Sequence, residues 1–220
     1  MQAEEVRQAA WNWMRSRLGS AADGHDCDHT IRVVRHALEL CRELPEADVF
    51  TVEIAAVLHD IARPEESAGR GVPDHAEAGA VLAEAFLLER GVAPEQARRI
   101  AACIREHRYR SDRRPTSPEA AILFDADKLD SLGATGIGRA FLFAGKTGAR
   151  LHNRKEEALS GAPYGPEDTA YREYLVKLRK LPEIMRTEPG RRRAGCLKCF
   201  MDDFFRQLNR EIYPEEVAKC

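Results

Sequence analysis

The sequence contains no apolar run that approaches the ~20 residues of a membrane-spanning helix, so we expect no membrane partner. It also lacks a strong charge of either sign. The net charge is only −2, which predicts no general attraction to nucleic acid or to a membrane surface. The first residues, Met1 to Glu5, are acidic and lack the basic-then-apolar order of a signal peptide. These absences together predict a cytoplasmic protein.

A disulfide framework is also missing. The six cysteines are scattered through 220 residues, and a chain of this length builds a core without cross-links. Cys196 and Cys199 have the spacing of a redox motif, but no second pair accompanies them. Because they fall within a charged helical pattern, we interpret them as two ordinary helix cysteines of a reduced protein.

No stretch shows the alternation of apolar and polar residues that is typical of a strand. With 44% hydrophobic and 32% charged residues, the chain suits one globular domain. We predict a single all-α domain over residues 1–220, with its core at about 20–145, a mobile segment at about 146–168 and C-terminal helices at about 168–212.

Apolar spacing and the capping and stopping residues predict the individual helices. Asp48 and Asp74 are candidate N-caps, and residues 63–73, rich in proline and glycine, are predicted to form a loop. The predicted helices span residues 3–18, about 24–44, 52–62, 75–90, 94–107, about 117–130, 133–148, 168–181 and 190–211, the last two joined across Pro182 and Pro189.

One apolar helical stretch, Val52 to Ala62, ends on a histidine and an aspartate side by side, His59 and Asp60. An imidazole and a carboxylate left unpaired among apolar side chains would cost roughly several kcal/mol. A divalent metal compensates for this well, because neutral imidazole and carboxylate are both good ligands. The alternative is a core histidine that is hydrogen-bonded to a neighbour.

Two more residues extend this pair to a possible metal site. Asp127 lies in the apolar run 121–127, where a carboxylate does not contribute to apolar packing. His29 lies early in the second predicted helix. With His59 and Asp60 they would form a site of two imidazoles and two carboxylates. That donor set favours Mn²⁺, Fe²⁺, Co²⁺ or Ni²⁺ over structural zinc, and Mg²⁺ is a further candidate. An ion with open positions would activate water.

His29, the pair His59-Asp60 and the distant Asp127 resemble the H…HD…D pattern of the HD-domain metal-dependent phosphohydrolase superfamily. The run Asp125-Ala126-Asp127-Lys128-Leu129-Asp130 is similar to the DADKLD motif of a branch of small bacterial HD hydrolases. The resemblance covers roughly residues 20–212. It implies a helical HD-domain bundle with a C-terminal helical pair, and metal-dependent hydrolysis of phosphate bonds in nucleotides.

Four further residues are weighed on this basis. His75 and His107 resemble the additional histidines of HD proteins with two metals, although capping or surface histidines are the alternative. We expect one ion rather than two, with His75 and His107 lining a phosphate pocket. Lys128 and Arg32 are candidates to neutralise phosphate oxygens. The alternatives are that Lys128 is a solvated lysine and that Arg32 pairs with a carboxylate.

The predicted function is a phosphohydrolase that acts on a nucleotide-like phosphoester or phosphoanhydride. Cleavage of a nucleoside triphosphate to monophosphate and pyrophosphate is the first expectation, and a monophosphate ester the second. Two other classes stay open: a di-iron HD-type oxygenase, and a non-catalytic nucleotide-binding module. The expected partner is a small phosphate substrate, not a nucleic acid.

Overall fold

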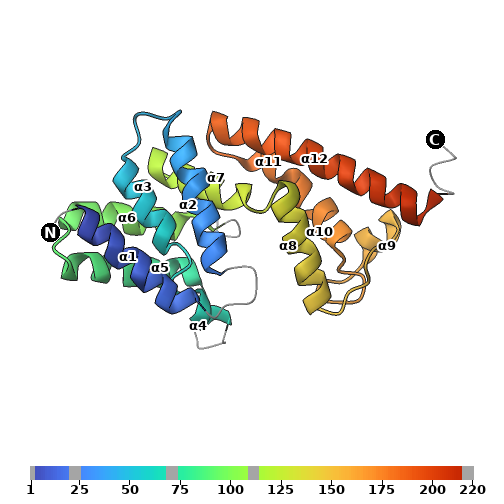
Figure 1. Cartoon of the computed structure of the whole chain (residues 1–220), viewed down its shortest axis with the longest axis horizontal. Coiled ribbons are helices and arrows are strands. Elements are labelled where there is room, and N and C mark those ends of the chain that lie inside the picture. Colours follow the sequence, from blue (N-terminus) through green and yellow to red (C-terminus); the bar gives the residue numbers. More distant parts are fainter. Residues whose placement is uncertain (1–2, 20–25, 68–73, 109–113, 215–220) are drawn as a thin grey trace. The chain divides into compact units, whose positions relative to one another are not determined.

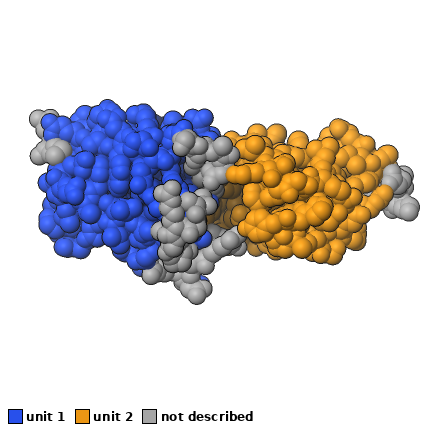
Figure 2. Space-filling view, turned by 90° about the horizontal axis from the view of Figure 1, so that it is seen from below, with its two compact units in different colours: residues 1–127 blue, residues 128–220 orange. Residues whose placement is uncertain are grey.

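The structure is a computed structural model that describes residues 3–19, 26–67, 74–108 and 114–214. Within these ranges the secondary structure is helical and there is no strand (Figure 1). The all-α prediction is therefore confirmed. The chain divides into two compact units, residues 1–127 and 128–220, which Figure 2 shows in different colours. The expected single domain, with its core and mobile segment, stays a prediction.

The first unit contains the helices that carry the candidate ligands. Three of them begin after an aspartate N-cap, because a carboxylate accepts from backbone N–H groups that have no partner within the helix. Asp48 accepts from Phe50 N at 3.1 Å and Asp74 from Ala76 N at 2.9 Å, so both predicted N-caps are confirmed. The helices are α1 (Ala3–Leu18), α2 (Cys27–Cys41), α3 (Val49–Leu58), α4 (Arg63–Ser67), α5 (His75–Glu89), α6 (Pro94–Glu106) and α7 (Pro118–Leu129), the last crossing into the second unit.

Helix α3 is the central element of this unit, and it packs against α1, α2 and α6. Seven of its ten residues are buried, which is what a helix that is apolar on all sides requires. Helix α5 packs against α6 beside it. His59 is the C-cap of α3, so the His59-Asp60 pair lies where the buried helix ends and its last carbonyls need partners. This position keeps both side chains out of water.

Three boundaries in this unit differ from the prediction. Helix α3 covers Val49–Leu58 instead of 52–62, and residues 59–62 form turns. Helix α2 ends at Cys41 instead of continuing to Leu44. The predicted loop at 63–73 was wrong in its first part, because α4 occupies Arg63–Ser67. Pro64 does not prevent this short helix, since a proline in the first turn gives up an N–H that has no helical acceptor anyway. The result matters for the site, because α4 begins only three residues after Asp60.

The second unit contains α8 (Gly133–Lys146), α9 (Lys155–Ser160), α10 (Ala170–Val176), the 3₁₀ turn η1 (Leu178–Lys180), α11 (Leu181–Ile184) and α12 (Glu188–Ile212). The predicted helix 168–181 is therefore two shorter pieces. Pro182 and Pro189 were expected between helices, but they lie in the first turns of α11 and α12, where proline is favoured.

Residues 150–168, part of the predicted mobile segment, contain α9 and buried side chains that are hydrogen-bonded. The buried Asn153 side chain donates to Glu167 O at 3.0 Å and accepts from Thr169 Oγ1 at 2.8 Å. His152, which we expected to be structural or exposed, is buried and hydrogen-bonded to the Asn209 side chain at 2.8 Å. Burial lowers the pKa of His152, so the ring is neutral near pH 7.

Two expectations about composition can be checked in the described residues. No described helix combines the length and the apolar character that crossing a membrane requires. Cys196 and Cys199 are both exposed and free on α12, in agreement with their interpretation as ordinary helix cysteines.

Candidate metal centre

The four predicted ligands come together from three elements of the first unit. His29 lies in the first turn of α2, His59 and Asp60 follow α3, and Asp127 lies on α7. His29 Nε2 lies 3.3 Å from His59 Nε2, 3.4 Å from Asp127 Oδ1 and 3.8 Å from Asp60 Oδ2. His59 Nε2 lies 3.7 Å from Asp60 Oδ2. We call this group, which faces Asp60 Oδ2, the inner side of the cluster.

Burial and the local backbone determine which ring nitrogen of His59 faces the cluster. His59 Nδ1 donates to Ala56 O at 2.8 Å, which leaves Nε2 with its lone pair toward His29 and the carboxylates. Burial lowers the pKa of His59 and His29 lowers it further, against the opposing effect of Asp60. The ring is therefore neutral near pH 7, as a metal ligand must be.

His75 and His107 approach the same carboxylate from its other oxygen. His75 Nε2 lies 3.2 Å and His107 Nε2 3.9 Å from Asp60 Oδ1. His107 Nδ1 donates to Ile104 O at 2.6 Å, so its Nε2 also faces the cluster. The His107 ring lies 5.2 Å from that of His59 and 5.4 Å from that of His75. We call this group, which faces Asp60 Oδ1, the outer side of the cluster.

The arrangement fits a divalent metal ion. The ligand atoms of His29, His59 and Asp127 lie within 4.8 Å of one another, and so do those of His59, Asp60 and His107. The lone pair of His59 Nε2 points toward another imidazole nitrogen and two carboxylates inside the protein. Such a convergence of electron-rich atoms is unfavourable unless a cation lies among them. Two donor sets are thus present, and they share His59.

A network of charged side chains next to the outer side was not found from the sequence. Arg63 Nη1 lies 3.3 Å from His75 Nε2 and 3.8 Å from Asp60 Oδ1. His75 Nδ1 lies 2.7 Å from Glu66 Oε2, and Arg108 Nη1 lies 2.9 Å from Glu66 Oε1. Burial opposes ionisation of Glu66, but His75, Arg108 and Arg63 outweigh it and lower the pKa of its carboxyl. The one available signal was helical spacing, because Arg63 follows Asp60 by three residues.

The other predicted residues have simple positions. Arg32 is half-buried on α2, three residues after His29, and Lys128 is buried on α7 directly after Asp127. Of the arginines near the end of α6, Arg105 pairs with Glu77 at 3.0 Å and Arg108 pairs with Glu66 and Asp74. The sequence favours a solvated loop or a cleft rim for the arginines at 105–114, whereas Arg105 and Arg108 form specific ion pairs. His25, Arg110 and Arg113 lie outside the described residues.

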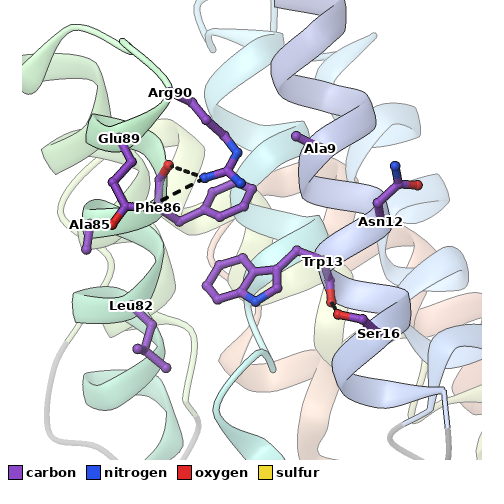
Figure 3. Close-up of a pocket in the computed structure, with 9 residues that line it drawn as sticks. All are labelled: Ala9, Asn12, Trp13, Ser16, Leu82, Ala85, Phe86, Glu89 and Arg90. Carbon is purple, nitrogen blue, oxygen red and sulfur yellow. Dashed lines mark hydrogen bonds and ion pairs between the residues drawn. The ribbon is translucent and has the colours of Figure 1, made fainter.

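A surface pocket of about 660 Å³ lies between α1 and α5 (Figure 3). Trp13 stacks on Phe86 with ring centroids 4.3 Å apart, and the Arg90 guanidinium lies 3.6 Å from the centroid of Phe86. None of the nine residues that line this pocket is a candidate metal ligand. The pocket is therefore distinct from the histidine–aspartate cluster.

Residues 27–132 match the family model described as HD domain, a span that includes all six cluster residues. The chain is also 34% identical over 215 residues to the uncharacterized protein YpgQ of Bacillus subtilis (strain 168), covering 96% of this chain and 94% of YpgQ. This chain belongs to the HD-domain family. The predicted family is thereby confirmed, while the branch with the DADKLD motif stays a prediction.

Solved structures of the family agree with the fold. The crystal structure of B. subtilis YpgQ in complex with ADP has a TM-score of 0.72 and 31% identity, covering 96% of this chain and 98% of that one. A predicted HD superfamily hydrolase from an uncultured Thermotogales bacterium has a TM-score of 0.66 and 29% identity, covering 93% and 91%. An HD-superfamily hydrolase from Bacillus thuringiensis has a TM-score of 0.73 and 28% identity, covering 96% and 98%. These names indicate hydrolysis as the class of activity in the HD family.

Proposed function

We propose that the protein is a metal-dependent phosphohydrolase that acts on a nucleotide-like phosphoester or phosphoanhydride. The ligands would be His29, His59, Asp60 and Asp127, holding one divalent ion. The observation that carries the proposal is the convergence of two buried imidazole Nε2 atoms, 3.3 Å apart, with two carboxylates. Mn²⁺, Fe²⁺, Co²⁺, Ni²⁺ and Mg²⁺ are the candidate ions for this donor set.

A bound divalent ion supplies Lewis-acid activation of water and of a phosphate oxygen. The protein's own side chains supply the remaining requirements of phosphate chemistry, which are positive charge and a proton. Lys128 and Arg32, each within one helical turn of a proposed ligand, are proposed to neutralise phosphate oxygens. His75 and His107 are proposed to line the phosphate pocket, where a histidine or a water molecule donates a proton to the leaving group.

The proposed substrate is a nucleoside triphosphate, cleaved to monophosphate and pyrophosphate, with a phosphate monoester as the second choice. A related protein, B. subtilis YpgQ, has been crystallised with ADP, which supports a nucleotide as the substrate class here. The histidine–aspartate cluster contains the groups that would act on its phosphates, whereas the aromatic pocket between α1 and α5 contains none of them.

One observation favours a second candidate, a di-iron oxygenase of the HD type. The outer side offers His59, Asp60 and His107 as a further donor set, with His75 Nε2 3.2 Å from Asp60 Oδ1. Six ligands, of which Asp60 is the shared carboxylate, would be sufficient for two irons. This candidate predicts iron-dependent consumption of O₂, which a hydrolase does not need.

The test is a screen of the protein, reconstituted in turn with each candidate ion, against nucleotides and generic phosphoesters. Release of pyrophosphate or phosphate without O₂, absent from Asp60→Ala, is the expected result. Iron-dependent O₂ uptake without phosphate release would replace the proposal with the oxygenase. Nucleotide binding without turnover under any ion would indicate a binding module.

A further inference from the structure

The outer side of the cluster contains a positively charged side chain as well as histidines. Arg63 is the first residue of α4, three residues after Asp60, and its Nη1 lies 3.8 Å from Asp60 Oδ1. The same nitrogen lies 3.3 Å from His75 Nε2. The Arg63 side chain is only about one quarter exposed, at 26%, so this charge lies in partly desolvated surroundings. Asp60 Oδ1 therefore already faces a cation.

The hydrogen-bonding capacity of arginine fixes the state of His75. A guanidinium only donates, so a hydrogen bond from Arg63 to His75 Nε2 places the ring proton on Nδ1. Independently, His75 Nδ1 lies 2.7 Å from Glu66 Oε2, and a carboxylate only accepts when it is ionised. Both contacts require the same tautomer. With this tautomer His75 Nε2 and Asp60 Oδ1, 3.2 Å apart, are two acceptors that need a cation beside them, and Arg63 Nη1 lies near both.

Glu66 is in turn held at both carboxylate oxygens, by His75 at Oε2 and by Arg108 at Oε1. Arg108 Nη1 lies 2.9 Å from Glu66 Oε1 and 3.1 Å from Asp74 Oδ1, and Asp74 is the N-cap of the helix that begins with His75. Arg108 also directly follows His107. These ion pairs and hydrogen bonds therefore connect α4, the start of α5 and the end of α6, which are the elements that form the outer side.

We infer that Arg63 is a built-in cation on the outer side of the cluster, held there by His75, Glu66 and Arg108, and that it takes the place of a second divalent ion. A second ion would need the lone pair of His75 Nε2, which Arg63 uses, and would lie next to a like charge. The inference rests on the proposed one-ion hydrolase and explains why this chain holds one ion although six ligands are present. Glu66 is a positioning residue, because it acts through His75.

The main experiment measures bound Mn²⁺ by equilibrium dialysis in the full-length protein. We expect about one equivalent in the unaltered protein and a second equivalent in Arg63→Met, where Asp60 Oδ1, His75 and His107 become available to an ion. The matched control is Arg105→Met, which removes an arginine from an ion pair between α5 and α6 and should stay at one equivalent. Two equivalents in the unaltered protein, or one in Arg63→Met, would overturn the inference.

A second measurement starts from the unaltered protein, so its main result does not depend on the folding of a variant. Long-range ¹H–¹⁵N spectra of the metal-free protein at about pH 8, above the ordinary histidine pKa, report which ring nitrogen carries the proton. We expect Nδ1–H for His75, and an Nε2–H signal would overturn the inference. Glu66→Met should weaken this preference, because only Arg63 then favours it, whereas Glu66→Gln should keep it, because the amide oxygen still accepts. Glu77→Gln is the control.

Neither measurement depends on turnover, so the two proposals fail separately. If the metal counts and the tautomer are as expected but no phosphate compound is cleaved, the proposed function is wrong and the role of Arg63 stands. If phosphate is released but Arg63→Met gains no metal, the function stands and Arg63 is not the second cation.

Discussion

The two sides of Asp60 are built in different ways. On the inner side, His59 is fixed by a backbone carbonyl of its own helix, and His29 lies in the first turn of a helix capped by Asp26. On the outer side, His75 is held by the side chains of Glu66 and Arg63, which come from the five-residue helix α4. Backbone anchors persist as long as the helix exists, whereas side-chain anchors depend on a few partly exposed charges. The difference indicates a rigid inner side next to a more adjustable outer side.

The largest effect is expected for Asp60→Ala, because Asp60 is shared by both sides. Removing an anionic ligand leaves the imidazoles with too little charge to hold a hard divalent ion. We expect loss of both bound metal and activity, with a far-UV spectrum that stays helical. A variant with full metal and full turnover would show that the site lies elsewhere.

His107→Ala tests the outer side alone. If His107 serves the phosphate pocket and is not a ligand, activity should fall by about 10²- to 10⁴-fold, the range for losing a general acid or base. Bound metal should stay near one equivalent, measured on the same sample. A fall from two equivalents to one would make both sides metal sites and would reopen the di-iron alternative.

Lys128→Ala tests whether the positive charge of Lys128, next to Asp127 of the inner side, is needed for turnover. Loss of one preorganised charge-stabilising donor should lower turnover of phosphate substrates by about 10²-fold. Metal content should not change, because an ammonium is not a ligand. An unaltered rate would assign Lys128 a purely structural role on α7.

The smallest effect is expected at the far end of the helix that leads to the inner side. Asp48 caps α3 and accepts from Phe50 N, Thr51 Oγ1 and Gln96 Nε2. Asp48→Ala should lower the free energy of unfolding by about 1 kcal/mol, the usual scale for an N-cap. The ligand geometry at the other end of α3 should survive, so metal content should not change.

The same residue gives a pH test. Burial tends to raise the pKa of the Asp48 carboxyl, but hydrogen bonds from Thr51, Gln96 and Phe50 outweigh it and hold the pKa below its ordinary value. The stabilisation is therefore fully present above the ordinary aspartate pKa and is lost as the pH falls through the lower pKa of the folded state. The difference between the unaltered protein and Asp48→Ala, measured by urea unfolding, should shrink in that acidic range. A constant difference would mean that the charge of Asp48 does not contribute.

Local sequence determined most of the helices and the inner side. Apolar periodicity and capping aspartates act over a few residues, so α1, α3 and α5 follow from their own sequences. His59, Asp60 and Asp127 could be selected because a polar group in an apolar run needs a partner, and that need is visible without knowing the partner. The helix ends near Leu44 and Pro182 were missed because competing boundaries differ by little free energy and packing decides between them.

Only the tertiary structure decided the charged network on the outer side, in which Arg63, Glu66 and Arg108 surround His75. Nothing in the spacing of Glu66, His75 and Arg108 along the chain requires that they meet, since charged residues beside proline and glycine are equally suited to a solvated loop. They meet because α5 and α6 pack together and bring the start of one helix beside the end of the other. A pairing of side chains from separate elements depends on how those elements pack, and helical periodicity within each element contains no information about it.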